Sequence, residues 1–258
     1  MGLDAVSLGR TGTQVTEIAF GTWRFGRETD GGDLETGPEE AEALLDAYAE
    51  AGGNFIDTAD VYGGGRAEEY IGEWLGDRDR EDFVIASKVY WRTREGDPNG
   101  RGLSRKHLRR QIELILDRLG TEYLDLLYVH RWDDDTPAAE FMRTLDRFVR
   151  DGRVNHLGIS TLAPDAWKVV KANEIARREG YEPFSVAQAR YNVVNREIEG
   201  NYLDMCEDYG LGVVPWSPLA GGFLTGKYDR GVEPPDGSRA AIDQRFAANY
   251  LTDENFDV

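Results

Sequence analysis

The sequence predicts a parallel α/β fold of barrel type in which seven strand–helix units follow one another. Short apolar runs of strand length alternate with longer segments that have helical periodicity, and a polar residue stands at the end of several runs. The strand-end positions 57, 88, 130, 160, 188 and 216 are 31, 42, 30, 28 and 28 residues apart, close to one βα unit per step. A chain of 258 residues with 40% apolar content suits one large core, so we expect a single domain over residues 1–258.

The N-terminal elements can be assigned from turn and capping residues. In residues 1–16, Gly9 and Gly12 separate two short apolar pieces, which predicts a hairpin that plugs the floor of the barrel. The first barrel strand is expected at 17–20. A helix then starts at Pro38, a favoured first helical residue, and ends at Gly52, directly before the second strand.

The later helices have apolar residues on one face and recognisable ends. The third is capped by Ser104 and stops at Gly120, and the fourth runs from Pro137 to Gly152. The predicted barrel strands are 17–20, 54–57, 83–88, 124–130, 156–160, 185–191 and 212–217. A (β/α)₈ barrel has eight strands, and the loop-rich tail 228–258 offers only a weakly helical stretch at 240–250. We therefore expect a barrel that lacks the eighth strand and the last helices and has an open seam between its first and last strands.

Composition restricts the partners. The net charge of −18 reflects 48 acidic against 30 basic residues, and such a surface repels nucleic acid and anionic membranes. The acids are spread along the chain and only five bases are lysines, a pattern that we interpret as adaptation to high salt. With no leader-like start and no membrane-length apolar run, the sequence predicts a soluble cytoplasmic protein. The single Cys206 excludes an internal disulfide and is expected to be a buried small side chain rather than a reactive thiol, and no metal site is expected.

Four polar residues at or just beyond strand ends predict an active site: Asp57, Tyr62, Lys88 and His130. In parallel α/β folds the carboxyl ends of the strands meet at one face, where catalytic groups gather. Any one of these residues alone would more often be a structural ion pair or a cap. His107 and His156 lie on a basic helix face and at a strand start, and we interpret both as structural.

Several sequence blocks occur together and in order. They are GNFIDTADVYG (53–63), Ser87-Lys88, LYVHRWD (127–133), GIS (158–160), Gln188 with Tyr191-Asn192, and PWSPLAGGFLTGK (215–227). With these blocks the chain resembles the aldo-keto reductase superfamily over nearly its whole length. The resemblance implies a (β/α)₈ barrel that binds a nicotinamide cofactor, usually NADP(H) with NAD(H) also open, and reduces aldehydes or ketones. No G-x-G-x-x-G follows a strand here, as expected for a family that lacks a Rossmann domain.

The resemblance assigns the general acid to Tyr62, its electrostatic partner to Lys88, the carboxylate that holds Lys88 to Asp57, and the orienting donor to His130. Hydride arriving at a carbonyl carbon builds negative charge on the oxygen, which must be stabilised and protonated. A free tyrosine has a pKa of about 10. An ammonium beside the phenol is expected to favour its ionised form and make it a better proton donor.

For the cofactor, the resemblance assigns Ser160, Thr161 and Gln188 to the nicotinamide carboxamide and Trp216 to stacking on the ring. Ser217, Leu219 and Gly221 are assigned to the ribose and diphosphate. Many family members have Asn at position 161 and Tyr at 216, so one carboxamide contact is expected to change and core packing stays an alternative for Trp216. The family's adenosine-phosphate contacts follow strand eight, a segment that this chain lacks.

Aromatic residues and one cation follow strands one, three and four at the same rim. Trp23, Tyr90, Trp91, Arg131 and Trp132 are expected either to form a substrate mouth or to pack beneath loops. Two other functions stay open: a nicotinamide-sensing binding module similar to potassium-channel β subunits, and an inactive truncated barrel with an exposed strand edge. The sequence determines neither the carbonyl substrate nor the oligomeric state.

Overall fold

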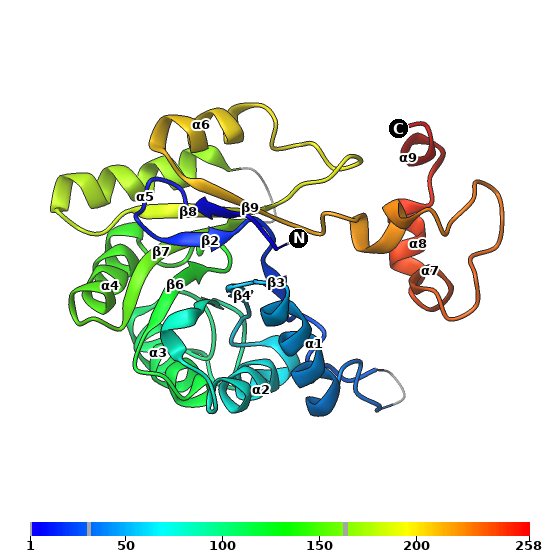
Figure 1. The fold of residues 1–258 in the computed structure, drawn as a ribbon. Coiled ribbons are helices and arrows are strands. Elements are labelled where there is room, and N and C mark those ends of the chain that lie inside the picture. Colours follow the sequence, from blue (N-terminus) through cyan, green and yellow to red (C-terminus); the bar gives the residue numbers. More distant parts are fainter. Residues whose placement is uncertain (1, 30–31, 162–164) are drawn as a thin grey trace.

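Seven parallel strands form one curled sheet in the computed structural model, which describes residues 2–29, 32–161 and 165–258 (Figure 1). The strands lie side by side in chain order from β3 to β9. Their bounds are β3 (Phe20–Gly21), β4 (Phe55–Asp57), β5 (Val84–Val89), β6 (Leu124–Val129), β7 (Val154–Thr161), β8 (Phe184–Arg190) and β9 (Gly212–Trp216). Within the described residues no eighth strand joins β9 to β3, so the predicted seven-stranded barrel is confirmed.

Helices cover the outside of this sheet. They are α1 (Pro38–Glu50), α2 (Arg66–Leu75), α3 (Arg105–Leu119), α4 (Ala138–Arg150), α5 (Ala166–Glu179) and α6 (Asn201–Tyr209). The capping signals explain their ends: the Ser104 hydroxyl accepts a hydrogen bond from the His107 backbone at 3.3 Å, and Gly120 ends α3 with φ +61°. Their apolar faces and the outer face of the sheet form the main hydrophobic core, which includes Cys206, buried as predicted.

The N-terminal hairpin consists of β1 (Ala5–Ser7) and β2 (Gln14–Thr16), which pair antiparallel. It contributes Leu8 and Val15 to a second core of residues that point into the barrel, among them Phe55 and Tyr128. The apolar side chains of the hairpin therefore fill the inside of the barrel.

The first barrel strand begins at Phe20, three residues later than the sequence predicted. Side chains hold the preceding residues in place: the Thr16 backbone donates to Asn54 Oδ1 at 2.7 Å, and the Tyr48 hydroxyl donates to the Ile18 carbonyl at 2.7 Å. The ladder of β3 is limited to two residues, which pair with Ile56 and Asp57.

The C-terminal tail is more ordered than the loop-rich segment that the sequence predicted. It contains α7 (Arg239–Ile242), α8 (Gln244–Tyr250) and α9 (Asp253–Phe256), which stand beside the barrel after the 3₁₀ segment Ala220–Thr225 (Figure 1). These elements surround a third core built around Phe223, Tyr228 and Phe246. The tail thus packs on its own aromatic cluster instead of extending the sheet.

Candidate active site

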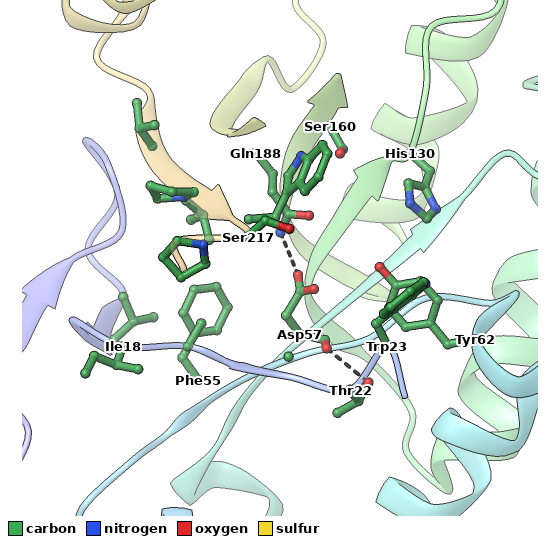
Figure 2. Close-up of a pocket in the computed structure, with 18 of the residues that line it drawn as sticks. Ile18, Thr22, Trp23, Phe55, Asp57, Tyr62, His130, Ser160, Gln188 and Ser217 are labelled. Atoms are coloured by element: carbon green, nitrogen blue, oxygen red, sulfur yellow. Dashed lines mark hydrogen bonds between the residues drawn. The ribbon is translucent and has the colours of Figure 1, made fainter. Parts of the chain in front are cut away.

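The carboxyl ends of neighbouring strands bring the four predicted catalytic residues together. Asp57 is the last residue of β4, Lys88 lies near the end of β5, and His130 follows β6. Tyr62 begins the 3₁₀ turn after β4. Figure 2 shows Asp57 hydrogen-bonded to Gln188 and to Thr22, with Tyr62 and His130 on one side and Ser217 on the other.

The Lys88 ammonium is fully buried and makes three hydrogen bonds. It forms an ion pair with Asp57 Oδ1 and donates to the Thr58 carbonyl at 2.8 Å and to the Tyr62 hydroxyl at 3.2 Å. An ammonium has three donors, so its hydrogen-bonding capacity is used completely. The group is therefore fixed beneath the phenol.

Charge pairing keeps Lys88 protonated although it is buried. Burial works to lower the pKa of the Lys88 ammonium, but the Asp57 carboxylate and the Tyr62 hydroxyl together outweigh it, and the net pKa is raised. The second Asp57 oxygen accepts a hydrogen bond from Gln188 Nε2 at 2.8 Å, which orients the carboxylate. Gln188, assigned from the sequence to the cofactor, therefore also supports the ion pair.

The pKa of the Tyr62 phenol is raised above that of a free tyrosine. Burial is the largest influence and raises the pKa of Tyr62, while Lys88 acts in the opposite direction and does not overcome it. Lys88 therefore favours ionisation of the phenol, as expected, but burial outweighs it. Desolvation, which the sequence does not reveal, makes the difference.

His130 is held as a neutral ring beside Tyr62. The two ring centroids are 6.0 Å apart in an edge arrangement, and Trp91 contacts the imidazole at 6.1 Å in the same manner. Burial, followed by the Lys88 charge, lowers the pKa of His130 to about 3. Its Nδ1 is buried and has no hydrogen-bond partner among the described residues, so packing against Tyr62 and Trp91 orients the ring.

A pocket of about 1360 Å³ opens at this mouth and continues along the seam between β3 and β9. Its lining includes residues that the sequence predicted for catalysis, the cofactor or the substrate: Trp23, Asp57, Tyr62, Trp91, His130, Ser160, Gln188, Trp216 and Ser217. Trp216 is half-buried and faces this space, which favours a role at the pocket over core packing alone. A space of this size accommodates a large ligand.

Other predicted residues do not line this pocket. Trp132 packs edge-on against Phe141 with ring centroids 5.2 Å apart, and Arg131 stacks over Trp91 at 5.6 Å. Leu219 is 55% exposed and Gly221 lies in the turn beyond β9. The structure therefore supports the packing alternative for Trp132. Thr161 ends β7, and its side chain lies outside the described part of the structure.

The turn after β9 is strained and held in place from the neighbouring loop. Ser217 and Ala220 adopt φ of +56° and +51°, a region that non-glycine residues seldom occupy. Asn192 donates from Nδ2 to the Ser217 carbonyl at 2.9 Å. The strained conformation is therefore fixed at the rim of the pocket.

Two cations lie against the glycines of this turn. A Cβ on Gly221 would come 2.8 Å from Arg239 Nη1, and one on Gly222 would come 3.2 Å from Lys227 Nζ. Arg239 also lines the pocket, but it was not singled out from the sequence because no motif surrounds it. Backbone amides and cations beside a glycine turn suit a phosphate group. The donor set thus fits a phosphate-bearing cofactor.

Two negative findings apply to the described residues. No helix there is long and apolar enough to cross a membrane. No group of His, Cys, Asp or Glu in the same part of the chain is arranged to hold a metal ion.

The fold and the site define a parallel α/β barrel with a buried Lys–Asp pair beneath a tyrosine at the mouth. The family model for the aldo/keto reductase family matches residues 17–257, and the chain belongs to this family.

Relatives whose names indicate different functions match over most of this chain. A norsolorinic acid reductase of Aspergillus flavus is 37% identical over 86% of this chain and 58% of its own length. A norsolorinic acid reductase of Emericella nidulans is 41% identical over 82% of this chain and 56% of its own length. A probable voltage-gated potassium channel subunit β of Oryza sativa subsp. japonica is 37% identical over 96% of this chain and 74% of its own length. The chain therefore spans less than two thirds of the length of these reductases.

Proposed function

We propose that the protein is an NADPH-dependent reductase that converts aldehydes or ketones to alcohols. The observation that carries the proposal is the Lys88 ammonium, which bonds to both Asp57 and the Tyr62 hydroxyl below an open pocket. A buried ion pair contributes little net stability to a core. Next to a phenol, however, it can stabilise the phenolate that forms when the phenol gives up its proton.

The bound nicotinamide would supply hydride to the carbonyl carbon. Tyr62 donates its proton to the oxygen as negative charge builds there, and Lys88, 3.2 Å from the phenol oxygen, stabilises the phenolate that remains. Asp57 keeps the ammonium charged and in place. The raised pKa of Tyr62 ensures that the phenol is protonated before the reaction.

His130 would orient the substrate carbonyl. Its imidazole stays neutral at physiological pH because its pKa is about 3, so it donates one N–H without bringing a positive charge next to Lys88. A neutral donor binds the carbonyl oxygen without competing with Tyr62 for the proton. Trp23 and Trp91 line the approach and favour substrates with an apolar body.

The cofactor would lie along the rim from β7 to the turn after β9. Ser160 and Gln188, with Thr161, are assigned to the carboxamide, and Trp216 to the nicotinamide face. The Gln188 amide nitrogen is engaged with Asp57, so its oxygen is the acceptor left for the carboxamide.

The strained turn would hold the ribose and the phosphates. Ser217, Leu219 and Gly221 supply the turn, and Arg239 and Lys227 place two positive charges against it. These two cations suit the diphosphate that NADP and NAD share, so they do not distinguish the two cofactors.

A second candidate is a binding module that senses nicotinamide without catalytic turnover. The rice potassium channel β subunit, which matches 96% of this chain, favours it. An inactive barrel with an open seam is the third. The negative surface further supports a soluble cytoplasmic protein that acts on small molecules and does not bind nucleic acid.

Replacing Tyr62 by Phe tests the proposal. Because only the proton donor is lost, turnover of a panel of aldehydes and ketones should fall at least about 1000-fold while NADPH affinity, measured by tryptophan fluorescence, changes little. Tyr123→Phe removes a hydroxyl that bonds Glu81 on the surface and serves as the matched control. Equal turnover in Tyr62→Phe and wild type would show that Tyr62 is not the acid. NADPH binding without turnover of any carbonyl would favour the binding module.

A further inference from the structure

A groove on the outer wall of the barrel concentrates positive charge on a strongly acidic protein. The helices α3 and α4 are neighbours on this wall (Figure 1). The groove between them has a volume of about 680 Å³. Its lining residues are Arg105, Arg109, Glu113, Arg143, Thr144, Asp146, Arg147, Phe148, Arg150, Asp151, Arg153 and Tyr181. Six of them are arginines and three are carboxylates, while the whole chain carries a net charge of −18.

The two ends of the groove differ in how their charges are paired. At the carboxyl end of the helices, ion pairs join Arg147 to Asp151 at 2.9 Å and Arg150 to Asp146 at 2.7 Å, and Arg153 pairs with Glu113. These contacts neutralise the cations there. This end is therefore an ordinary surface network of small energetic value.

At the amino end, three cations have no such neutralisation. Arg105, Arg109 and Arg143 form no ion pair with a carboxylate of the described residues; Arg143 instead donates from Nε to the Tyr181 hydroxyl at 2.9 Å. Arg105 and Arg109 are one helical turn apart on α3, where like charges repel. Arg143 lies across the groove on α4.

The helix dipole makes this arrangement still less favourable. The first turn of α3 carries Arg105 and Lys106 and no acidic residue. The amino end of a helix is already positive, so basic residues there raise the free energy of the folded chain unless an anion compensates. Glu140 accepts a hydrogen bond from the Arg105 backbone at 3.2 Å, which satisfies one amide. Glu113 attracts Arg109 and Glu179 attracts Arg143 without forming an ion pair, so the three guanidinium groups have no directly paired carboxylate among the described residues.

We propose that the amino end of this groove binds an anion that carries a chain of two or three phosphate groups. Guanidinium groups match phosphate oxygens in bidentate geometry, and three of them facing one space suit several adjacent phosphates better than a single carboxylate. The volume is within the range of small-ligand sites. The site is separate from the barrel mouth and shares no lining residue with the pocket there.

Titration calorimetry with inorganic tripolyphosphate tests this site, in about 50 mM NaCl so that screening stays weak. One saturable site per chain is expected in the wild-type protein. Arg109→Gln/Arg143→Gln should weaken binding at least about tenfold, because two bidentate partners are lost. Arg110→Gln is the matched control: it removes the same charge from the next residue of α3, which is exposed and does not line the groove. Adenosine triphosphate as a second ligand shows whether a nucleoside adds to the affinity.

Arg239→Gln separates this site from the phosphate turn at the active site. If the Arg239→Gln protein still binds tripolyphosphate, the groove is supported as the site. If Arg239→Gln abolishes binding while Arg109→Gln/Arg143→Gln binds fully, the proposal is overturned. Equal weakening in Arg110→Gln and in the double variant would overturn it too, since general charge would then explain the binding. Tripolyphosphate should raise the melting temperature of the wild type and not of the double variant. If the double variant does not fold, Arg105→Gln and Arg109→Gln, measured singly, carry the same expectation.

Discussion

Two acidic side chains lie buried beside the Lys88 strand and differ in their partners. Glu68 accepts hydrogen bonds from the Ser87 hydroxyl at 2.6 Å and from Arg118 Nη1 at 2.9 Å. Neither oxygen of the Asp60 carboxylate has a hydrogen-bond partner among the described residues. Burial, and then the charge of Glu68, raises the pKa of Asp60 well above its usual value. Burial raises the pKa of Glu68 as well, but Ser87 and Arg118 offset part of this effect, whereas no hydrogen-bonding side chain does so for Asp60.

Asp60→Asn should stabilise the protein at neutral pH. The folded chain holds the Asp60 proton more tightly than the unfolded chain, so the wild type loses stability as pH rises from about 4 through the raised pKa. Asn does not titrate, so its advantage should be about 1–3 kcal/mol at pH 7 and should vanish below about pH 4. Thermal denaturation at a series of pH values measures this, with the exposed Asp82→Asn as control. A lower melting temperature at pH 7, or a difference that does not depend on pH, would contradict it.

For single residues, the sequence predicts where the catalytic side chains lie better than it predicts their pKa values. The sequence alone predicts that Asp57, Lys88 and His130 lie close together, because each stands at or near the end of a parallel strand. The raised pKa values of Tyr62 and Asp60 result from burial, and the side chains that bury these groups come from distant segments. Such packing leaves no local signal in the sequence.

Among the helices, α2 and α3 approach each other most closely at Gly72. A Cβ at this position would lie 2.2 Å from the Arg118 carbonyl oxygen and 2.9 Å from the Leu119 carbonyl carbon. Both are backbone atoms and cannot move aside as a side chain tip can. The Glu68–Arg118 ion pair joins the same two helices one turn away. Gly72 therefore sets the distance at which this pair forms.

Gly72→Ala should push the two helices apart. Although alanine favours a helix, the clash with backbone is expected to destabilise the fold by about 1–3 kcal/mol. Chemical denaturation measures the change. Gly12→Ala, where a Cβ would meet nothing within 4 Å, is the control and should leave stability nearly unchanged. A Gly72→Ala protein as stable as the wild type would show that the helix contact adapts easily.

Regular elements were predictable because each has a short-range signal. Capping residues and apolar periodicity give α3 its bounds, Ser104 to Gly120, from neighbouring residues alone. The weakly helical stretch predicted at 240–250 corresponds to α7 and α8, but the packing of this tail was not predicted, because its core joins Phe223, Tyr228 and Phe246, which come from separate short segments without a common period. Trp132 was ambiguous for the same reason, since its partner Phe141 is on the following helix.

At the scale of the whole molecule, the excess of carboxylates dominates the surface. With a net charge of −18, the carboxylates repel one another, and salt screens this repulsion. The α3–α4 groove is a local exception, because arginines outnumber carboxylates there. We expect the melting temperature to rise steadily between about 0.1 and 2 M KCl. An equal osmolality of sucrose separates screening from general exclusion effects. A melting temperature that stays flat or falls in KCl would contradict the interpretation of the surface as adapted to salt.

The open seam connects the stability of the barrel to its proposed ligand. The pocket is lined by Gly21 on β3 and by Val213 and Val214 on β9, so the unpaired edges of the sheet form part of its wall. Adding the last strand and helix of a related protein after Val258 should pair these edges and complete the wall. The melting temperature should then rise, and NADPH affinity should increase about tenfold, equivalent to about 1.4 kcal/mol. The control is the same extension with its strand residues replaced by Gly and Ser, which preserves length but cannot form the ladder or pack inside the barrel. If both extensions leave affinity and melting temperature unchanged, the seam does not limit this protein, and the cations beside the turn after β9 would be sufficient to hold the cofactor.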